Sequence, residues 1–307
     1  MTSRPAPTRA LVGTNLAIVY IIWGSTYLGI AVAIETAQPM WAMGVRVTGA
    51  GLLMTLVVAI FKGPRVLKVP LREAVSGAGL GLVMLTAGIG SVAMGERYVP
   101  IGVAALLVAT GPLWGVLFRT VTGDRPHAFT WIGVAVGLLG LVMLLRPTGE
   151  GMSVDRITWS LVILCGQVIW TLGSFMAPKM TLPRDPLVLV AYEMTFGGVF
   201  FFLWSRLLHE NVDLSVISTR SWVAILYLTT AGVVGYTGFT WLITHVPLSL
   251  AMTYAYVNPV VAVFLGWLVL QQQITLALVI GGSLTLAGVA LVVAGERSGG
   301  RMKVERE

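Results

Sequence analysis

The sequence predicts an all-α integral membrane protein, in which ten transmembrane helices form two inverted five-helix repeats around a central cavity. Mean hydropathy is +0.87, and only 11% of the residues are charged, whereas about a quarter are charged in soluble domains. Ten apolar runs are long enough to cross a bilayer core of about 30 Å. The chain also repeats itself at a constant step, which indicates one five-helix unit written twice.

The repeat is carried by residue types that chance seldom aligns. In each case the second copy lies 147 residues after the first, and the matches are Trp23/Trp170, Pro39/Pro186, Pro100/Pro247 and Pro112/Pro259. Thr48/Thr195, Gly51/Gly198 and Gly88/Gly235 obey the same step. We therefore expect a first domain over residues 11–146 and a second over residues 157–295, joined by a polar linker that contains Gly and Pro.

Each predicted span is an apolar run bounded by Pro, Gly or charged residues. The five spans of the first copy are Leu11–Ile34, Pro39–Phe61, Glu73–Met94, Pro100–Val121 and Ala128–Leu145. Those of the second copy are Ile157–Ala177, Pro186–Leu208, Trp222–Ile243, Pro247–Leu270 and Ile274–Ala294. Four spans open with Pro, which the first turn of a helix tolerates because its amide has no partner there.

Lys and Arg predict the orientation. With the N-terminus inside, 14 of the 20 Lys and Arg lie on the inner side, five lie on the outer side, and Arg46 lies within a span. Both termini are then expected in the cytoplasm of a multi-pass protein. Because each repeat has an odd number of spans, the second copy enters the membrane upside down, as in many secondary transporters.

Two ionisable residues lie deep in apolar spans at equivalent repeat positions, Arg46 and Glu193. A charge at this depth costs at least about 2.5–3.5 kcal/mol, so such residues are candidates for function. They could flank a cavity, where Arg46 binds a carboxylate and Glu193 binds an amine or a proton. Alternatively they form a structural pair that locks the two halves, or Arg46 extends toward the membrane interface.

Aromatic and hydroxyl side chains share one face of the first span, and their counterparts share a face of the sixth. Tyr20, Trp23 and Tyr27 lie at i, i+3 and i+7, which sets these three side chains on one helical face. The predicted binding residues here are Tyr20, Trp23, Ser25 and Tyr27 in the first copy, and Gln167, Trp170 and Ser174 in the second. They suit a wet, amphipathic substrate path, although plain aromatic packing would give the same pattern.

Pro112 and Pro259 lie in the middle of the fourth and ninth spans. A proline inside a helix removes a hydrogen bond and kinks the helix, so we expect these two residues to act as hinges of a gate, unless the kinks are static. Tyr254 and Asn258 add polar character beside Pro259 and join the predicted binding residues.

The sequence offers no visible catalytic machinery. His127, His209 and His245 have no second metal ligand at a suitable spacing, no nucleophile has an adjacent base, and no phosphate-binding loop is present. Cys165 is the only cysteine, so a disulfide framework is excluded. We expect no enzyme activity, no cofactor, no metal and no nucleic-acid partner; the net charge of +7 is interpreted as a topology signal.

Several segments together resemble the drug/metabolite transporter superfamily, specifically its ten-span proteins with two EamA-type domains. They are residues 23–28 (WGSTYL), 46–51 (RVTGAG), 99–107 (VPIGVAALL) and 257–266 (VNPVVAVFLG). The resemblance implies a bacterial inner-membrane exporter of amino acids or related metabolites with a central cavity. The family often has an acidic residue after the fourth helix of each repeat; Asp124 stands there in the first copy, whereas Gln271–Gln273 replace it in the second.

We therefore expect a carrier that exports small amphipathic metabolites by alternating access, with amino acids as the favoured substrate class. Its expected partners are the substrate and membrane lipid, and it would act as a monomer or a weak homodimer. Efflux of cationic drugs through the same path is an alternative, and a membrane-embedded enzyme or assembly factor is a more distant one.

Overall fold

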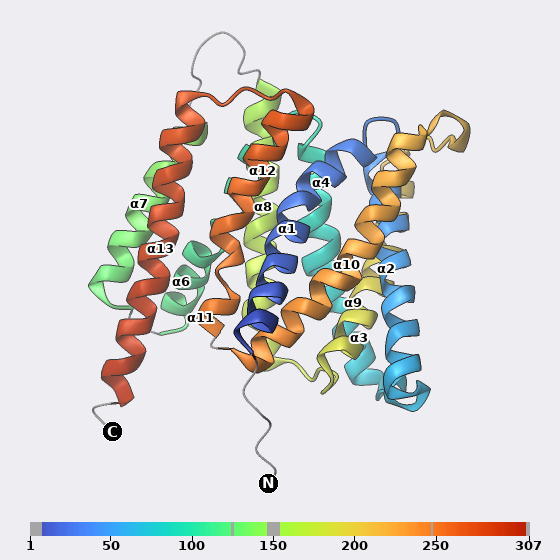
Figure 1. The fold of residues 1–307 in the computed structure, drawn as a ribbon, viewed down its shortest axis with the longest axis horizontal. Coiled ribbons are helices and arrows are strands. Elements are labelled where there is room, and N and C mark those ends of the chain that lie inside the picture. Colours follow the sequence, from blue (N-terminus) through green and yellow to red (C-terminus); the bar gives the residue numbers. More distant parts are fainter. Residues whose placement is uncertain (1–7, 124–125, 146–153, 247, 305–307) are drawn as a thin grey trace. The chain divides into compact units, whose positions relative to one another are not determined.

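The computed structural model describes residues 8–123, 126–145, 154–246 and 248–304, and these residues are helical apart from short connectors (Figure 1). Nine helices in this part of the chain are long and apolar enough to span a membrane, and Tyr254–Leu270 is a shorter apolar helix. The all-helical membrane fold is thus confirmed. Asp124, Arg146 and Pro247, which the sequence analysis singled out, lie outside the described residues.

The chain forms two compact units, and each combines helices from both halves of the sequence. Unit 1 consists of residues 1–81 and 181–261, and unit 2 of residues 82–180 and 262–307. The helices of unit 1 are α1 (Arg9–Ala33), α2 (Pro39–Lys62), η1 (Pro64–Leu67), α3 (Leu71–Leu80), α9 (Pro186–Leu207), η4 (Leu214–Val216), α10 (Thr219–His245), α11 (Leu248–Ala251) and the start of α12 (Tyr254–Leu270).

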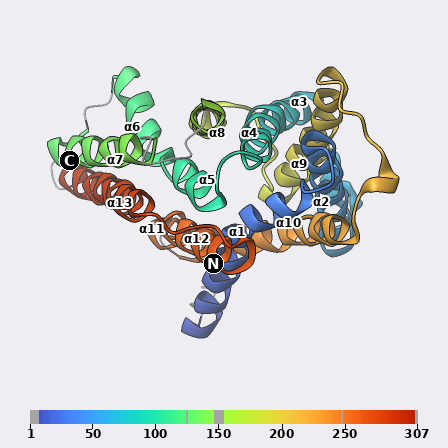
Figure 2. The same ribbon diagram turned by 90° about the horizontal axis from the view of Figure 1, so that it is seen from above.

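Unit 2 also combines helices from both halves of the sequence. Its helices are the π-helix η2 (Gly81–Ile89, from Leu82 onward), α4 (Gly90–Gly95), α5 (Ile101–Val108), α6 (Gly111–Val121), α7 (Ala128–Leu145), α8 (Val154–Met176), η3 (Ala177–Lys179), the rest of α12, and α13 (Leu276–Val304). The largest helix contact here joins α7 and α13, which lie side by side in Figures 1 and 2.

Small residues bring equivalent helices together. In unit 1, a Cβ on Gly51 would lie 2.4 Å from the backbone nitrogen of Thr195, and one on Gly198 would lie 2.4 Å from that of Thr48. These contacts are reciprocal under the 147-residue step, so α2 and α9 pack antiparallel about a local twofold relation. Close approach through Gly is the usual way in which helices associate in lipid.

The same reciprocity appears in unit 2 between α7 and α13. A Cβ on Gly133 would lie 2.8 Å from the carbonyl oxygen of Gly288, and one on Gly281 would lie 3.1 Å from that of Gly140. The step is 148 residues here, as the alignment of these glycines requires. Equivalent helices therefore pair with each other inside each unit, and this pairing builds the two cores.

Two predicted spans are interrupted. The fourth, Pro100–Val121, breaks into α5 and α6 at Ala109–Thr110. Pro112 has no amide hydrogen for the carbonyl of Val108, and the break lies directly before this proline. At the break the carbonyl oxygen of Leu107 accepts from both the hydroxyl and the amide of Thr110, at 2.6 and 3.3 Å.

The ninth span, Pro247–Leu270, divides into α11 and α12 at Met252–Thr253. Pro259 lies inside α12 and does not cause this break, because the carbonyl that it leaves unbonded is that of Ala255. The two prolines are equivalent in sequence, whereas the two breaks are not. The fold at these places is thus less symmetric than the repeat.

Candidate substrate site

Trp23 of α1 lies at the centre of an aromatic cluster in unit 1. Its ring centroid lies 4.6 Å from that of Tyr254, 5.0 Å from that of Phe239 and 5.5 Å from that of Tyr236. The rings of Trp23 and Tyr254 meet edge to face at 89°, a geometry worth about 0.5–1.5 kcal/mol beyond burial. Gly235 makes this arrangement possible, because a Cβ there would lie 2.5 Å from Nε1 of Trp23.

Tyr20, one turn earlier on α1, connects the cluster to the interrupted helix. Its hydroxyl hydrogen-bonds the hydroxyl of Thr253, the residue between α11 and α12. The Thr253 hydroxyl also donates to the carbonyl oxygen of Leu250 at 2.5 Å. The aromatic face of α1 therefore contacts the point at which the backbone leaves the helix, where side-chain hydroxyls satisfy backbone groups.

Asn258 faces α1 from the helix α12. Tyr254 contacts Trp23, and Val261 packs against Gly24; Asn258 lies between them at helical spacings that share one face. The residue is only 8% exposed, and its Oδ1 atom has no hydrogen-bond partner within the described part of the chain. A buried amide oxygen without a partner calls for an explanation, and a bound polar ligand would supply one.

The two buried charges come from the neighbouring helices α2 and α9. Arg46 is 8% exposed, and its Nη1 lies 3.7 Å from Sδ of Met43. Glu193 is partly buried. Both helices pack against α10, which carries Tyr236 and Phe239 of the aromatic cluster. Unit 1 thus holds a guanidinium, a carboxylate and four aromatic rings on helices that pack together.

Two segments, residues 13–146 and 157–294, match the model of the EamA-like transporter family and together make up most of the chain. The chain belongs to the EamA-like transporter family. Its resemblance to the drug/metabolite transporter superfamily is thereby confirmed, and it is a multi-pass membrane transporter of small molecules.

Named relatives agree with this membership. The chain is 36% identical over 254 residues to the "Uncharacterized inner membrane transporter YedA" of Escherichia coli K12, covering 82% of this chain and 80% of that protein. It is 23% identical over 279 residues to the "Uncharacterized transporter YoaV" of Bacillus subtilis, with 88% and 92% covered. A solved crystal structure matches with a TM-score of 0.65 at 21% identity, covering 94% of this chain and 99% of that one, and so shares the fold.

The other predicted site residues of this EamA-family chain have different surroundings. Tyr27 is buried in unit 1. Ser25 contacts the hydroxyl of Tyr227 at 2.5 Å and donates to the carbonyl oxygen of Ile21, so it lies apart from the cluster. In unit 2, Trp170 packs on Gly88 of the π-helix, whereas Ser174 is exposed and donates to the carbonyl oxygen of Trp170.

Gln167 of α8 contacts the break between α5 and α6. Its Nε2 donates to the Thr171 hydroxyl at 3.1 Å, and a Cβ on Gly111 would lie 2.6 Å from the same nitrogen. Gly111 directly precedes Pro112. In unit 2 the structure therefore brings a predicted polar residue to a predicted hinge.

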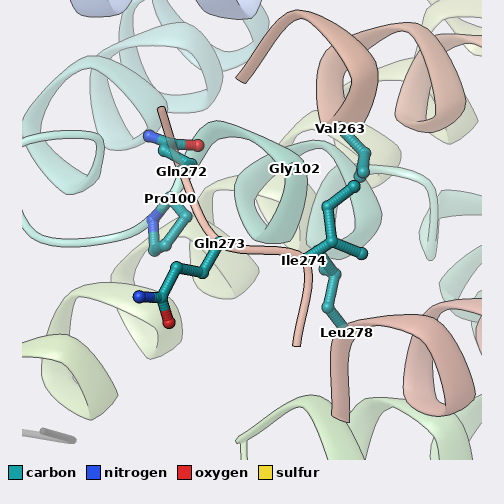
Figure 3. A pocket seen from close by; sticks show the side chains of 7 residues that line it. All are labelled: Pro100, Gly102, Val263, Gln272, Gln273, Ile274 and Leu278. Atoms are coloured by element: carbon teal, nitrogen blue, oxygen red, sulfur yellow. The ribbon is translucent and has the colours of Figure 1, made fainter. Parts of the chain in front are cut away.

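A small cleft in unit 2 is lined by Pro100, Gly102, Val263, Gln272, Gln273, Ile274 and Leu278 (Figure 3). Its volume of about 10 Å³ leaves room for at most one water molecule, so it is no substrate chamber. Gln272 has a structural role here, because its Oε1 accepts a hydrogen bond from the first amide of α5, that of Ile101, at 3.1 Å.

Sequence reasoning missed Tyr236, Phe239 and Thr253. The equivalents of the two aromatic residues, 147 positions earlier, are Ile89 and Val92, so the repeat gave no signal for them. The matched pairs Trp23/Trp170 and Gly88/Gly235 are repeated residues that contact each other across the two halves of the sequence. Trp23 packs on Gly235, and Trp170 packs on Gly88.

Proposed function

We propose that this transporter exports small amphipathic metabolites from the cytoplasm across the bacterial inner membrane, with amino acids as the favoured substrate class. The observation that carries the proposal is that Arg46, Glu193 and the Trp23 aromatic cluster lie in unit 1 on helices that pack together. A guanidinium suits a carboxylate, a carboxylate suits an amine, and aromatic rings suit an apolar side chain. Asn258 offers one more polar atom to such a ligand.

Alternating access between two inverted repeats is the mechanism we favour. The reciprocal contacts of Gly51 with Thr195 and of Gly198 with Thr48 support it, since they relate equivalent helices of the two halves. Pro112 and Pro259 would serve as hinges of the gates. The name of the relative YedA supports the inner membrane as its location, and we propose that both termini face the cytoplasm and that the monomer suffices for transport.

The test uses purified protein in liposomes, a panel of labelled amino acids, and assays with and without a pH gradient. We expect Arg46→Ala to raise the half-saturating substrate concentration about 10- to 100-fold, as loss of a hydrogen bond to a charged group implies. Arg46→Lys should recover part of the loss. Arg206→Gln, which removes an exposed cation at the end of α9, is the matched control.

Efflux of cationic compounds is the second candidate, because aromatic rings beside a carboxylate also attract cations. It predicts that Arg46→Ala leaves transport largely intact and that Glu193→Gln abolishes it. Glu193→Gln further separates the two modes of coupling. Proton antiport requires loss of pH-driven accumulation in this variant, whereas intact coupling would rule antiport out.

A further inference from the structure

The connector from α2 to α3 in unit 1 is an ordered segment rich in cations. Gly63, at φ +85°, turns the chain out of α2, a conformation that glycine adopts readily. The η1 turn follows, and the hydroxyl of Tyr192 in α9 donates to the carbonyl oxygen of Leu67 at 2.9 Å. We call residues 61–75 the basic connector. Its four cations are Lys62, Arg65, Lys68 and Arg72.

Three of these four cations form no ion pair within the part of the chain that the structure describes. Lys62 pairs with Asp185 at 2.5 Å. Arg65, Lys68 and Arg72 are exposed, and none of them makes an ion pair or a side-chain hydrogen bond with any residue that the structure describes. The connector thus presents three open positive charges close to the ends of two membrane-spanning helices.

Large apolar side chains are exposed between these cations. The exposed fractions are 81% for Phe61, 79% for Leu71, 61% for Val75 and 37% for Val66. Apolar groups interleaved with Lys and Arg are typical of segments that lie in the membrane interface, where the apolar groups enter the lipid and the cations meet the headgroups.

The equivalent connector in the second copy shows that the fold itself does not require these cations. This segment, residues 208–222, also contains a short 3₁₀ turn, η4, but it has Glu210 and Asp213, and no Lys or Arg at the positions equivalent to the four cations. We call it the acidic connector. Glu210 accepts hydrogen bonds from the backbone amides of Met40 and Trp41, both at 3.0 Å. Asp213 accepts one from the amide of Ser215 at 2.9 Å.

We propose that the basic connector binds the headgroup phosphate of an anionic phospholipid. Arg65, Lys68 and Arg72 supply the charge, and the exposed apolar side chains contact the acyl chains. Charge complementarity identifies the ligand, because unpaired cations at a membrane interface attract anionic lipid. The acidic connector at the opposite end of α2 would not bind it. This lipid site is independent of the substrate site.

The experiment is a titration of delipidated protein in neutral detergent with dioleoylphosphatidylglycerol, with bound lipid counted by native mass spectrometry. Dioleoylphosphatidylcholine serves as the neutral reference. We expect the triple variant Arg65→Gln/Lys68→Gln/Arg72→Gln to bind phosphatidylglycerol about 100-fold more weakly, roughly fivefold for each cation removed. Binding of phosphatidylcholine should stay unchanged.

Two controls keep the result decisive. Arg206→Gln/His209→Asn/Arg220→Gln removes the basic side chains at the other end of α9 and within the acidic connector, and it should bind phosphatidylglycerol as the unmodified protein does. Arg65→Lys/Lys68→Arg/Arg72→Lys keeps the charge and should retain at least half of the affinity. Equal loss in both Gln-containing variants, or no loss in the first, would overturn the proposal.

Discussion

Single glycines decide how closely the helices of unit 1 approach each other. Gly51 and Gly198 each face a backbone nitrogen of the opposing helix at 2.4 Å from where a Cβ would stand. A backbone atom cannot give way as a side chain can. We therefore expect Gly51→Ala and Gly198→Ala to force α2 and α9 apart and to cost about 1–3 kcal/mol, the usual range for overpacking.

The measurement is the apparent melting temperature in detergent at a fixed heating rate, since such unfolding is seldom reversible. Gly79→Ala is the matched control, because no atom lies within 4 Å of a Cβ at that position of α3. Ala is the better helix former by about 1 kcal/mol, so this control should leave the melting temperature unchanged or raise it. A similar drop in all three variants would refute the packing argument.

At this scale the repeat marked residues that take part in close packing, but it did not predict which residues they contact. Trp23 and Gly235 each have an equivalent at a distance of 147 residues, and the structure packs one against the other. Tyr236 and Phe239 occur in one copy alone, so only the packing of α10 on α1 reveals that they surround Trp23. Whether these residues bind substrate stays a prediction.

The helices α2 and α9 are tied together at both ends by charged groups. At one end Glu210 caps the first amides of α2. At the other end Lys62 pairs with Asp185, which also caps α9 by accepting from the amide of Leu187 at 3.0 Å. Partial burial raises the pKa of Asp185, but the bonds from Lys62 and from the Leu187 amide outweigh this effect and hold the pKa below its ordinary value.

The sign of the resulting pH dependence follows from linkage. A carboxyl whose pKa is depressed in the folded state stabilises the protein above its unfolded pKa of about 3.9 and loses that contribution as the pH falls through the folded pKa. We therefore expect Lys62→Met to lower the apparent melting temperature at pH 7 and to converge with the unmodified protein as the pH falls through the folded-state pKa of Asp185. A difference that is constant over this range would contradict the assignment.

Asp185 itself separates the cap from the ion pair. Asn is as good as Asp at the start of a helix, so Asp185→Asn should resemble Lys62→Met, whereas Asp185→Ala should lose about 1 kcal/mol more.

The starts of helices also explain the boundary errors of sequence reasoning. The helix α10 begins at Thr219, three residues before the predicted Trp222, because Ser218 caps it by accepting from the amide of Ser221.

Element types could be predicted from apolar runs, but of their interruptions only the one in the fourth span could. Pro112 predicted a disturbance in the fourth span, and the break lies directly before it. At the break at Met252–Thr253 the hydroxyl of Thr253 contacts that of Tyr20, a residue more than 200 positions away, and no local pattern carries that information. The same holds for the π-helix Gly81–Ile89, whose counterpart in α10 is a regular helix.

At the scale of the molecule, sequence and packing divide the chain differently. The repeat separates a first half from a second half, whereas each compact unit takes helices from both. An apolar run specifies that a helix lies in lipid, but not which helix it packs against. Glycines in matched positions supply that information for α2 with α9 and for α7 with α13. The two halves therefore fold as interlocked partners.

The orientation of the two connectors is the remaining prediction, and the 147-residue step provides a matched pair of probes. Lys68 in the basic connector and Ser215 in the acidic one are equivalent and exposed. In a Cys165→Ser background, which removes the exposed native thiol, we expect a membrane-impermeant maleimide to label Ser215→Cys in intact cells. Lys68→Cys should react only after permeabilisation, because Lys and Arg stay on the cytoplasmic side. Labelling of both variants from outside would exclude an inverted repeat. Labelling of Lys68→Cys alone would show that the protein has the opposite orientation in the membrane.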